Sequence, residues 1–158
     1  MTTIRNLILT LLAILPLALS AQGGLSDSDR QRWLGEMRNY KHDFLTKELG
    51  LTREQQRDFF PLYDEMEDEI ARLNAETREI ENRASANQDA TDLELENAAR
   101  SVFELKRAEG QIEMIYFDKF KTILTPRQLL LLKNTERRFT QQLVNHHRRM
   151  RRGDSPQK

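Results

Sequence analysis

The sequence contains no cysteine, which removes several ways of stabilising an exported protein or giving it a chemical activity. Without cysteine the chain forms no disulfide, carries no lipid on a thiol and has no thiolate for catalysis or metal binding. Glycine and proline are also few, at 6 and 4 residues of 158, and no segment shows the alternation typical of a β-strand. We therefore expect an all-α fold that is held together by packing alone.

Sequence motifs typical of enzymes are missing as well. Acidic residues are plentiful, but no segment resembles a nucleophile with its base, a glycine-rich phosphate-binding loop or a metalloprotease helix. We therefore expect a protein that is not an enzyme and that uses no cofactor.

Residues 1–21 have the order of a secretory signal peptide. Arg5 is followed by an apolar run from Leu7 to Leu19 and then by the small residues Ser20 and Ala21. The run is shorter than the roughly 20 residues that span a bilayer, and it contains a proline, so a membrane helix is disfavoured. We expect export, with cleavage after either Ser20 or Ala21.

The remaining chain is predicted to form one all-helical domain at residues 28–152, between a mobile lead at 22–27 and a disordered tail at 153–158. Four segments begin with a Ser or Thr followed three residues later by Gln or Glu, which is the pattern of a helix-starting capping box. The expected helices cover residues 28–50, 53–83, 91–123 and 125–152.

A five-residue phrase occurs twice, as Leu51-Thr-Arg-Glu-Gln55 and Leu124-Thr-Pro-Arg-Gln128. The Thr hydroxyl caps an amide three residues on, and the Gln amide reaches back to the Thr amide. In the second copy Pro126 occupies the first helical position, where its missing N–H does no harm. The motif residues are interpreted as structural: Leu51, Thr52, Gln55, Leu124, Thr125 and Gln128.

Apolar residues recur at helical spacing along each predicted helix, and these positions are the expected core. Pro61 lies inside the second helix and either kinks it or splits it, and continuation of the apolar pattern through Leu62 and Tyr63 favours a kink. Because 32% of residues are charged, the core is thin. We expect an elongated, kinked hairpin arrangement that a second subunit completes as a homodimer. The expected core positions are Trp33, Met37, Tyr40, Phe44, Leu45, Met66, Ile70, Leu73, Thr77, Ile80, Ala98, Val102, Leu105, Ala108, Ile112, Ile115, Leu132, Thr135, Phe139, Leu143, His146 and Met150.

Four consecutive leucines, 129–132, cannot all face one neighbour, because successive residues on a helix diverge by about 100°. The same holds for Phe59-Phe60 and for Ile115-Tyr116-Phe117. One interpretation is ordinary core plus dimer interface. The other is an exposed apolar and cationic surface that holds unfolded polypeptide, and its candidate residues are Phe103, Phe117, Leu129, Leu130, Lys106, Arg107, Lys119, Lys121 and Arg127.

The three histidines do not predict a metal site. His146 and His147 diverge on their helix, neither has a carboxylate or histidine one turn away, and four arginines follow. Acidic residues concentrate in the first half of the mature chain and basic residues in the second, so the two halves are candidates for contact within or between subunits. For an exported protein the basic residues favour acidic polypeptide segments or a peripheral contact with an anionic membrane surface over nucleic acid.

An exported, cysteine-free, four-helix chain with Leu-Thr-x-x-Gln at the starts of its second and fourth helices resembles the Spy/CpxP family of bacterial periplasmic proteins. The resemblance implies a cradle-shaped antiparallel homodimer in the periplasm, acting as an ATP-independent chaperone or envelope-stress protein that binds unfolded clients. Two alternatives remain, a metal-responsive sensor acting on a membrane partner and a structural helical adaptor. Pro61, the four leucines and the arginine-rich tail depart from the family pattern.

Overall fold

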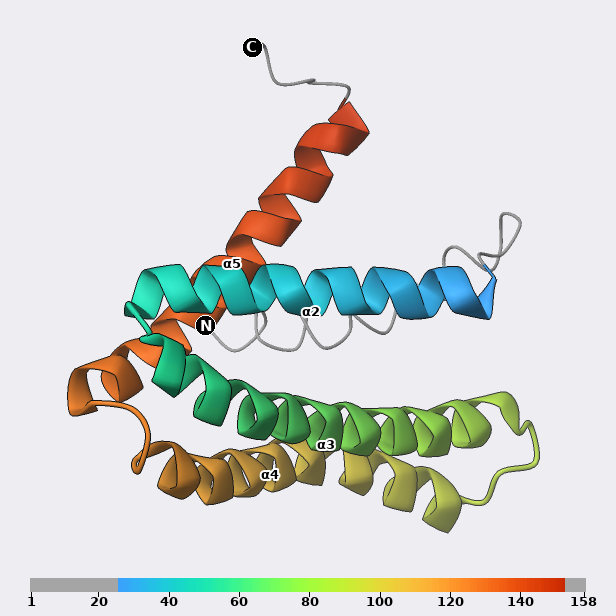
Figure 1. Cartoon of the computed structure of the whole chain (residues 1–158). Coiled ribbons are helices and arrows are strands. Elements are labelled where there is room, and N and C mark those ends of the chain that lie inside the picture. The colour runs from blue at the N-terminus through green and yellow to red at the C-terminus, as the bar shows by residue number, and fades with distance from the viewer. Residues whose placement is uncertain (1–25, 153–158) are drawn as a thin grey trace. The chain divides into compact units, whose positions relative to one another are not determined.

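The computed structural model describes residues 26–152, and for residues 146, 147 and 149–152 it describes the backbone only. This part of the chain contains four α-helices and no strand, which confirms the predicted all-α fold (Figure 1). The predicted signal peptide and tail lie outside the described residues. The helices are α2 (Asp27–Leu49), α3 (Arg53–Ala86), α4 (Asp92–Phe120) and α5 (Pro126–Arg152).

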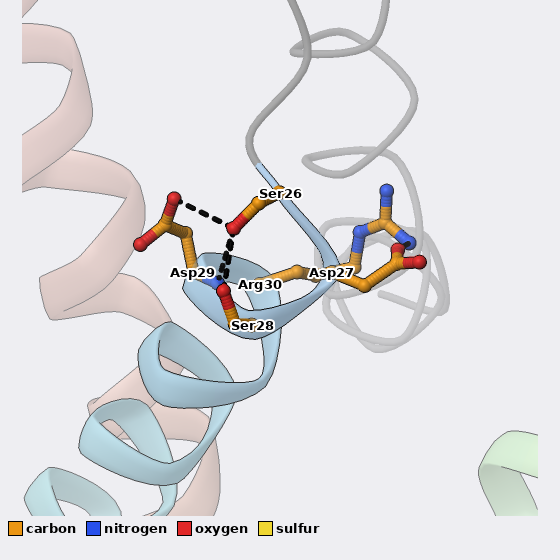
Figure 2. Close-up of polar contacts among 5 residues, drawn as sticks. All are labelled: Ser26, Asp27, Ser28, Asp29 and Arg30. Atoms are coloured by element: carbon orange, nitrogen blue, oxygen red, sulfur yellow. Dashed lines mark hydrogen bonds and ion pairs between the residues drawn. The ribbon is translucent and has the colours of Figure 1, made fainter.

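Helix α2 begins two residues earlier than the sequence predicts. Its N-cap is Ser26 and not Ser28, because the Ser26 Oγ accepts a hydrogen bond from the Asp29 backbone amide at 3.2 Å (Figure 2). The hydroxyl also contacts the Asp29 carboxylate at 2.9 Å and the Ser28 hydroxyl at 2.6 Å. The earlier cap places Asp27 and Asp29 in the first turn, where negative charge is stabilised by the helix dipole.

Helix α2 ends at Gly50, as the sequence predicts. Gly50 adopts the left-handed conformation, with φ of 61°, and its amide bonds to the Thr46 carbonyl. The Leu51 amide bonds to the same carbonyl at 3.0 Å. A residue without a Cβ pays no steric penalty in this conformation, so the glycine closes α2 and lets α3 begin after three residues.

The other predicted helix starts are confirmed, and the predicted end of α5 at residue 152 agrees with the structure, whereas the predicted ends of α3 and α4 are off by three residues. Thr91 and Glu94 form a complete capping box before α4, and α5 begins at Pro126. Helix α3 is continuous through Pro61, which excludes the split, and it ends at Ala86 instead of Arg83. Helix α4 ends at Phe120, because residues 121–123 turn with bonds over three residues, such as Ile123 N to Phe120 O at 3.0 Å.

The predicted single domain is divided into two compact units. The first, here called the α2–α5 unit, comprises residues 26–56 and 124–152 of the described chain. In it α2 and α5 cross (Figure 1). The Phe139 ring packs on Tyr40 and Phe44 with centroid distances of 5.6 and 5.4 Å. Arg138 pairs with Glu48 beside this contact. The buried side chains of this core are Leu45, Leu49, Leu51, Leu124, Leu132, Thr135, Phe139 and Thr140.

The second unit is the α3–α4 hairpin, residues 57–123. Its helices run antiparallel, so that Phe59 meets Phe120 at a centroid distance of 4.9 Å while Asn74 hydrogen-bonds Glu109 at 2.7 Å (Figure 1). The core of the hairpin is a single narrow line of contacts between two helices. Its buried side chains are Phe59, Tyr63, Met66, Ile70, Thr77, Ala98, Glu109, Tyr116 and Phe120.

The predicted core positions are confirmed in part. Leu45, Met66, Ile70, Thr77, Ala98, Leu132, Thr135 and Phe139 are buried. Tyr40, Ile80, Val102 and Ile115 are exposed, and those predictions are wrong. For Ile115 the error has a simple origin: the helix turns Tyr116 and Phe120 towards α3, which leaves Ile115 pointing away from α3. The side chains of His146 and Met150 lie outside the described residues, and the remaining predicted positions are half-buried.

The same substitution at two glycines is predicted to change stability in opposite directions. Gly50→Ala should lower the free energy of unfolding by about 1 kcal/mol, because Ala is strained at positive φ. Gly35→Ala, inside α2 with open space around its Cβ position, should raise it by about 0.5–1 kcal/mol. Urea unfolding followed by circular dichroism measures both. Changes of the same sign would contradict the assigned end of α2.

Candidate functional site

Exposed large apolar side chains concentrate on α4. Ten such side chains occur among the described residues, and seven of them belong to this helix. Phe103 is 82% exposed, which is unusual for a phenylalanine in a folded unit. The α4 members are Leu93, Leu95, Val102, Phe103, Met114, Ile115 and Phe117. A helix that leaves this much apolar surface in solvent is a candidate interaction surface.

Phe103, Met114 and Phe117 line up with Gly110 along one flank of α4, about 100° around the helix from the residues that are buried against α3. Phe103 and Phe117 lie seven residues before and after Gly110, so all three fall within about 40° around the helix. Tyr116, which is buried against α3, points away from Gly110 by about 120°. We define the outer stripe as Phe103, Lys106, Arg107, Gly110, Met114, Phe117 and Lys121.

The outer stripe carries three cations, Lys106, Arg107 and Lys121, and one carboxylate, that of Glu113, lies at its edge. Among the residues that the structure describes, neither Lys106 nor Arg107 forms an ion pair, and both are exposed. Lys121 lies 3.4 Å from the Asp118 carboxylate, and its Nζ lies 5.9 Å from the centre of the Phe117 ring. Cations that stand beside exposed apolar groups without an anionic partner favour a ligand carrying both apolar side chains and carboxylates.

The side of α4 that faces α3 is anchored to it by polar contacts. The Glu109 carboxylate, on a residue that is 5% exposed, accepts a 2.7 Å hydrogen bond from the Asn74 amide. The Tyr116 hydroxyl donates to Glu69 at 3.3 Å. Burial, together with the carboxylates of Glu65 and Glu69, raises the pKa of Tyr116 to about 12, so the phenol remains a donor at neutral pH. These contacts fix which side of α4 faces outwards.

The predicted binding residues are not all brought together. Phe103, Phe117, Lys106, Arg107 and Lys121 share the outer stripe. Lys119 is instead half-buried on the α3 side, with its Nζ 4.0 Å from the centre of the Tyr116 ring and 3.9 Å from Glu65.

The remaining three predicted binding residues, Arg127, Leu129 and Leu130, belong to the α2–α5 unit. Leu130 is 79% exposed and Leu129 is half-buried, while Leu132 is buried, so the leucine run does diverge as the sequence indicates. The sequence reasoning did not include Met114 among the binding residues. Its position four residues after Gly110 and three before Phe117 is the signal that would have found it.

Both Leu-Thr-x-x-Gln motifs make the capping hydrogen bonds that the sequence predicts. The Thr52 Oγ1 accepts from the Gln55 amide at 3.2 Å, and the Thr52 amide donates to the Gln55 side chain at 3.1 Å. Thr125 and Gln128 repeat these two bonds at 3.3 and 2.9 Å. The two leucines that precede the threonines, Leu51 and Leu124, are buried.

The structure adds a contact between the two motifs that the sequence did not predict. The Gln55 Nε2 donates to the Gln128 Oε1 at 2.8 Å, and the Gln128 Nε2 donates to the Gln55 Oε1 at 3.0 Å. We call this reciprocal pair the glutamine clasp. The Gln128 Nε2 also lies 3.3 Å from the Leu49 carbonyl. Each amide therefore caps its own helix and joins the other motif, all within the α2–α5 unit.

Among the described side chains there is no group of three or more His, Asp and Glu residues placed to hold a metal ion. The side chains of His146 and His147 lie outside the described residues. None of the helices in residues 26–152 is long and apolar enough to span a bilayer.

Breaking the clasp is predicted to cost more than removing one cap. In Gln128→Glu the carboxylate still accepts from the Thr125 amide, but it has no N–H for Gln55 or Leu49. We expect the free energy of unfolding to fall by about 2–3 kcal/mol, because the Gln55 Oε1 and the Leu49 carbonyl, both in part-buried contacts, lose the donor that Gln128 supplies, and the Gln55 Oε1 then faces a carboxylate. Thr125→Ala, which removes the hydroxyl cap and leaves the clasp, should cost about 1 kcal/mol. Equal losses in urea unfolding would show that the clasp adds nothing to the caps.

Comparison of the chain with protein-family models, with curated proteins and with solved structures finds no match. The resemblance to the Spy/CpxP family therefore stays a prediction based on the two Leu-Thr-x-x-Gln motifs.

Proposed function

We propose that this protein is an exported, ATP-independent holdase that binds unfolded or misfolded polypeptides on the outer stripe of α4. The observation that carries the proposal is the exposure of Phe103, Met114 and Phe117 on one side of a well-anchored helix. Full burial of one such side chain against a client stabilises the complex by about 1.5–3 kcal/mol. Several together hold an apolar segment that would otherwise aggregate.

The charges of the outer stripe support a role in capture and release. Lys106, Arg107 and Lys121 attract acidic segments over about a Debye length and so speed encounter. Because these cations lie on an exposed surface, each contributes little to the lifetime of the complex. Binding of this kind needs no nucleotide, because weak contacts let the client dissociate. Once the client folds, its apolar segments are buried and no longer bind.

The proposed location is the periplasm. It rests on the predicted signal peptide at residues 1–21 and on the resemblance to periplasmic Leu-Thr-x-x-Gln proteins, in which such chains act as chaperones or envelope-stress proteins. The thin core of the hairpin is consistent with the expected homodimer, which remains a prediction that sedimentation equilibrium would check.

Aggregation assays on matched variants test the proposal. The double variant Phe103→Gln/Phe117→Gln should require at least about tenfold more protein to suppress aggregation of several unrelated unfolding clients, because two apolar anchors are lost. The control is Ile115→Gln, which also removes an exposed apolar side chain of α4 but lies about 140° from Gly110 around the helix.

Both proteins should fold equally well, since Gln is a good helix former and all three positions are exposed. Light scattering measures suppression, and circular dichroism confirms folding. If the wild-type protein does not slow aggregation at equimolar ratio, or if the double variant suppresses as well as the control, the holdase proposal is wrong.

A further inference from the structure

The outer stripe has the repeat of a helix and not of a strand. Phe103, Lys106, Gly110, Met114 and Phe117 recur at steps of three and four along α4, and the C-cap residue Lys121 continues them, which brings one side chain into line about every 5.4 Å. In an extended chain, side chains on one face recur about every 6.6 Å. This repeat differs from the roughly 5.4 Å repeat of the outer stripe, so the two fall out of register within a few residues. From Phe103 to Lys121 the line is about 27 Å long, which equals about five helical turns of a partner. The spacing matches a second helix laid along α4.

Gly110 is the second observation. It stands at the middle of the stripe, and no atom lies within 4 Å of the place where a Cβ would be. A glycine inside a helix destabilises it relative to alanine, so a role in the folded chain is expected of it. No packing within the hairpin requires the missing Cβ, because the space around it is open. A small residue between two large apolar ones lets a partner backbone come close to α4 at that point.

An extended partner would find little else to bind. A strand gains most of its affinity by adding to the edge of a sheet, where backbone donors and acceptors are free. The backbone groups in the middle of α4 already bond to each other within the helix. A partner of the outer stripe must therefore bind through side chains on one face, which is how an amphipathic helix binds.

We infer that the outer stripe takes polypeptides in helical form: an amphipathic helix with carboxylates beside its apolar face crosses α4 at Gly110, between Phe103 and Phe117. The carboxylates of the partner helix pair with Lys106 and Arg107, which have no ion pair among the described residues. The inference rests on the proposed holdase function and narrows it, because clients would be held through segments that have already formed helix.

Peptide binding to the full-length protein tests the inference. The probe is a synthetic peptide of about 21 residues, with Leu at heptad positions a and d and Glu beside them, which forms an amphipathic helix. A second peptide of the same composition has the order scrambled, so that it has no apolar face. A third replaces Glu with Lys. We expect the first peptide to bind at least tenfold more tightly than either of the others in calorimetry.

The decisive variants place one leucine at two neighbouring positions. Gly110→Leu adds apolar area to the stripe but blocks close approach, so affinity for the helical peptide should fall at least tenfold. Gln111→Leu adds the same area about 100° away around the helix and should leave affinity unchanged. If Gly110→Leu binds the helical peptide as tightly as the wild-type protein or more tightly, the crossing at Gly110 is wrong. Equal binding of the scrambled peptide would also overturn the inference.

Different experimental results would show that the inference is wrong and that the holdase proposal is wrong. Should Phe103→Gln/Phe117→Gln lose aggregation suppression while helical and scrambled peptides bind alike, the holdase proposal stands and the helical selectivity falls. If Phe103→Gln/Phe117→Gln still suppresses aggregation, the holdase proposal is wrong. The inference, which rests on that proposal, is then wrong as well. If the double variant instead converts a dimer to a monomer in sedimentation and no peptide binds the wild-type protein, the stripe is covered by a second copy and the inference is overturned.

Discussion

The constraint on which this molecule depends is that a helix packed against one neighbour buries only one side of itself. In the α3–α4 hairpin that side of α4 carries Ala98, Glu109, Tyr116 and Phe120, and it is held by the bonds to Asn74 and Glu69. Residues that do not face α3, including those on the flank about 100° around the helix, are then exposed, whatever their chemistry. The presence there of Phe103 and Phe117 is therefore a property of the sequence that packing within the hairpin does not explain.

The glutamine clasp satisfies backbone amides at the starts of two helices and also joins those two helix starts. The helices α3 and α5 each begin with orphan amides, and two threonines and two glutamines satisfy some of them within each first turn. A glutamine amide has more hydrogen-bonding capacity than one cap uses, and the remaining donors join the two motifs. One residue type thus starts two helices and holds their first turns together inside the α2–α5 unit.

These two features explain how a cysteine-free chain with 32% charged residues stays ordered while exposing apolar surface. The cores are narrow, but each is closed by aromatic contacts, such as Phe59 with Phe120 and Phe44 with Phe139, and by satisfied polar side chains. Among the described residues no buried side-chain nitrogen or oxygen lacks a hydrogen-bond partner. Stability that does not depend on covering the outer stripe leaves that stripe available to a partner, which is what the proposed function requires.

The sequence by itself determined the helical class, three of the four helix starts, the end of α2 at Gly50 and the divergence of the leucine run. It did so because caps, glycine termini and the turn angle of a helix act within a few residues. It misplaced the start of α2, since Ser26 and Ser28 offer the same hydroxyl and only the bond formed with Asp29 distinguishes them. Only the tertiary structure decided that Lys119 turns towards Tyr116, that Ile115 stays outside and that Gln55 meets Gln128 across 73 residues of chain. Those choices depend on which two helix faces meet, and that is set by contacts between residues far apart in the sequence.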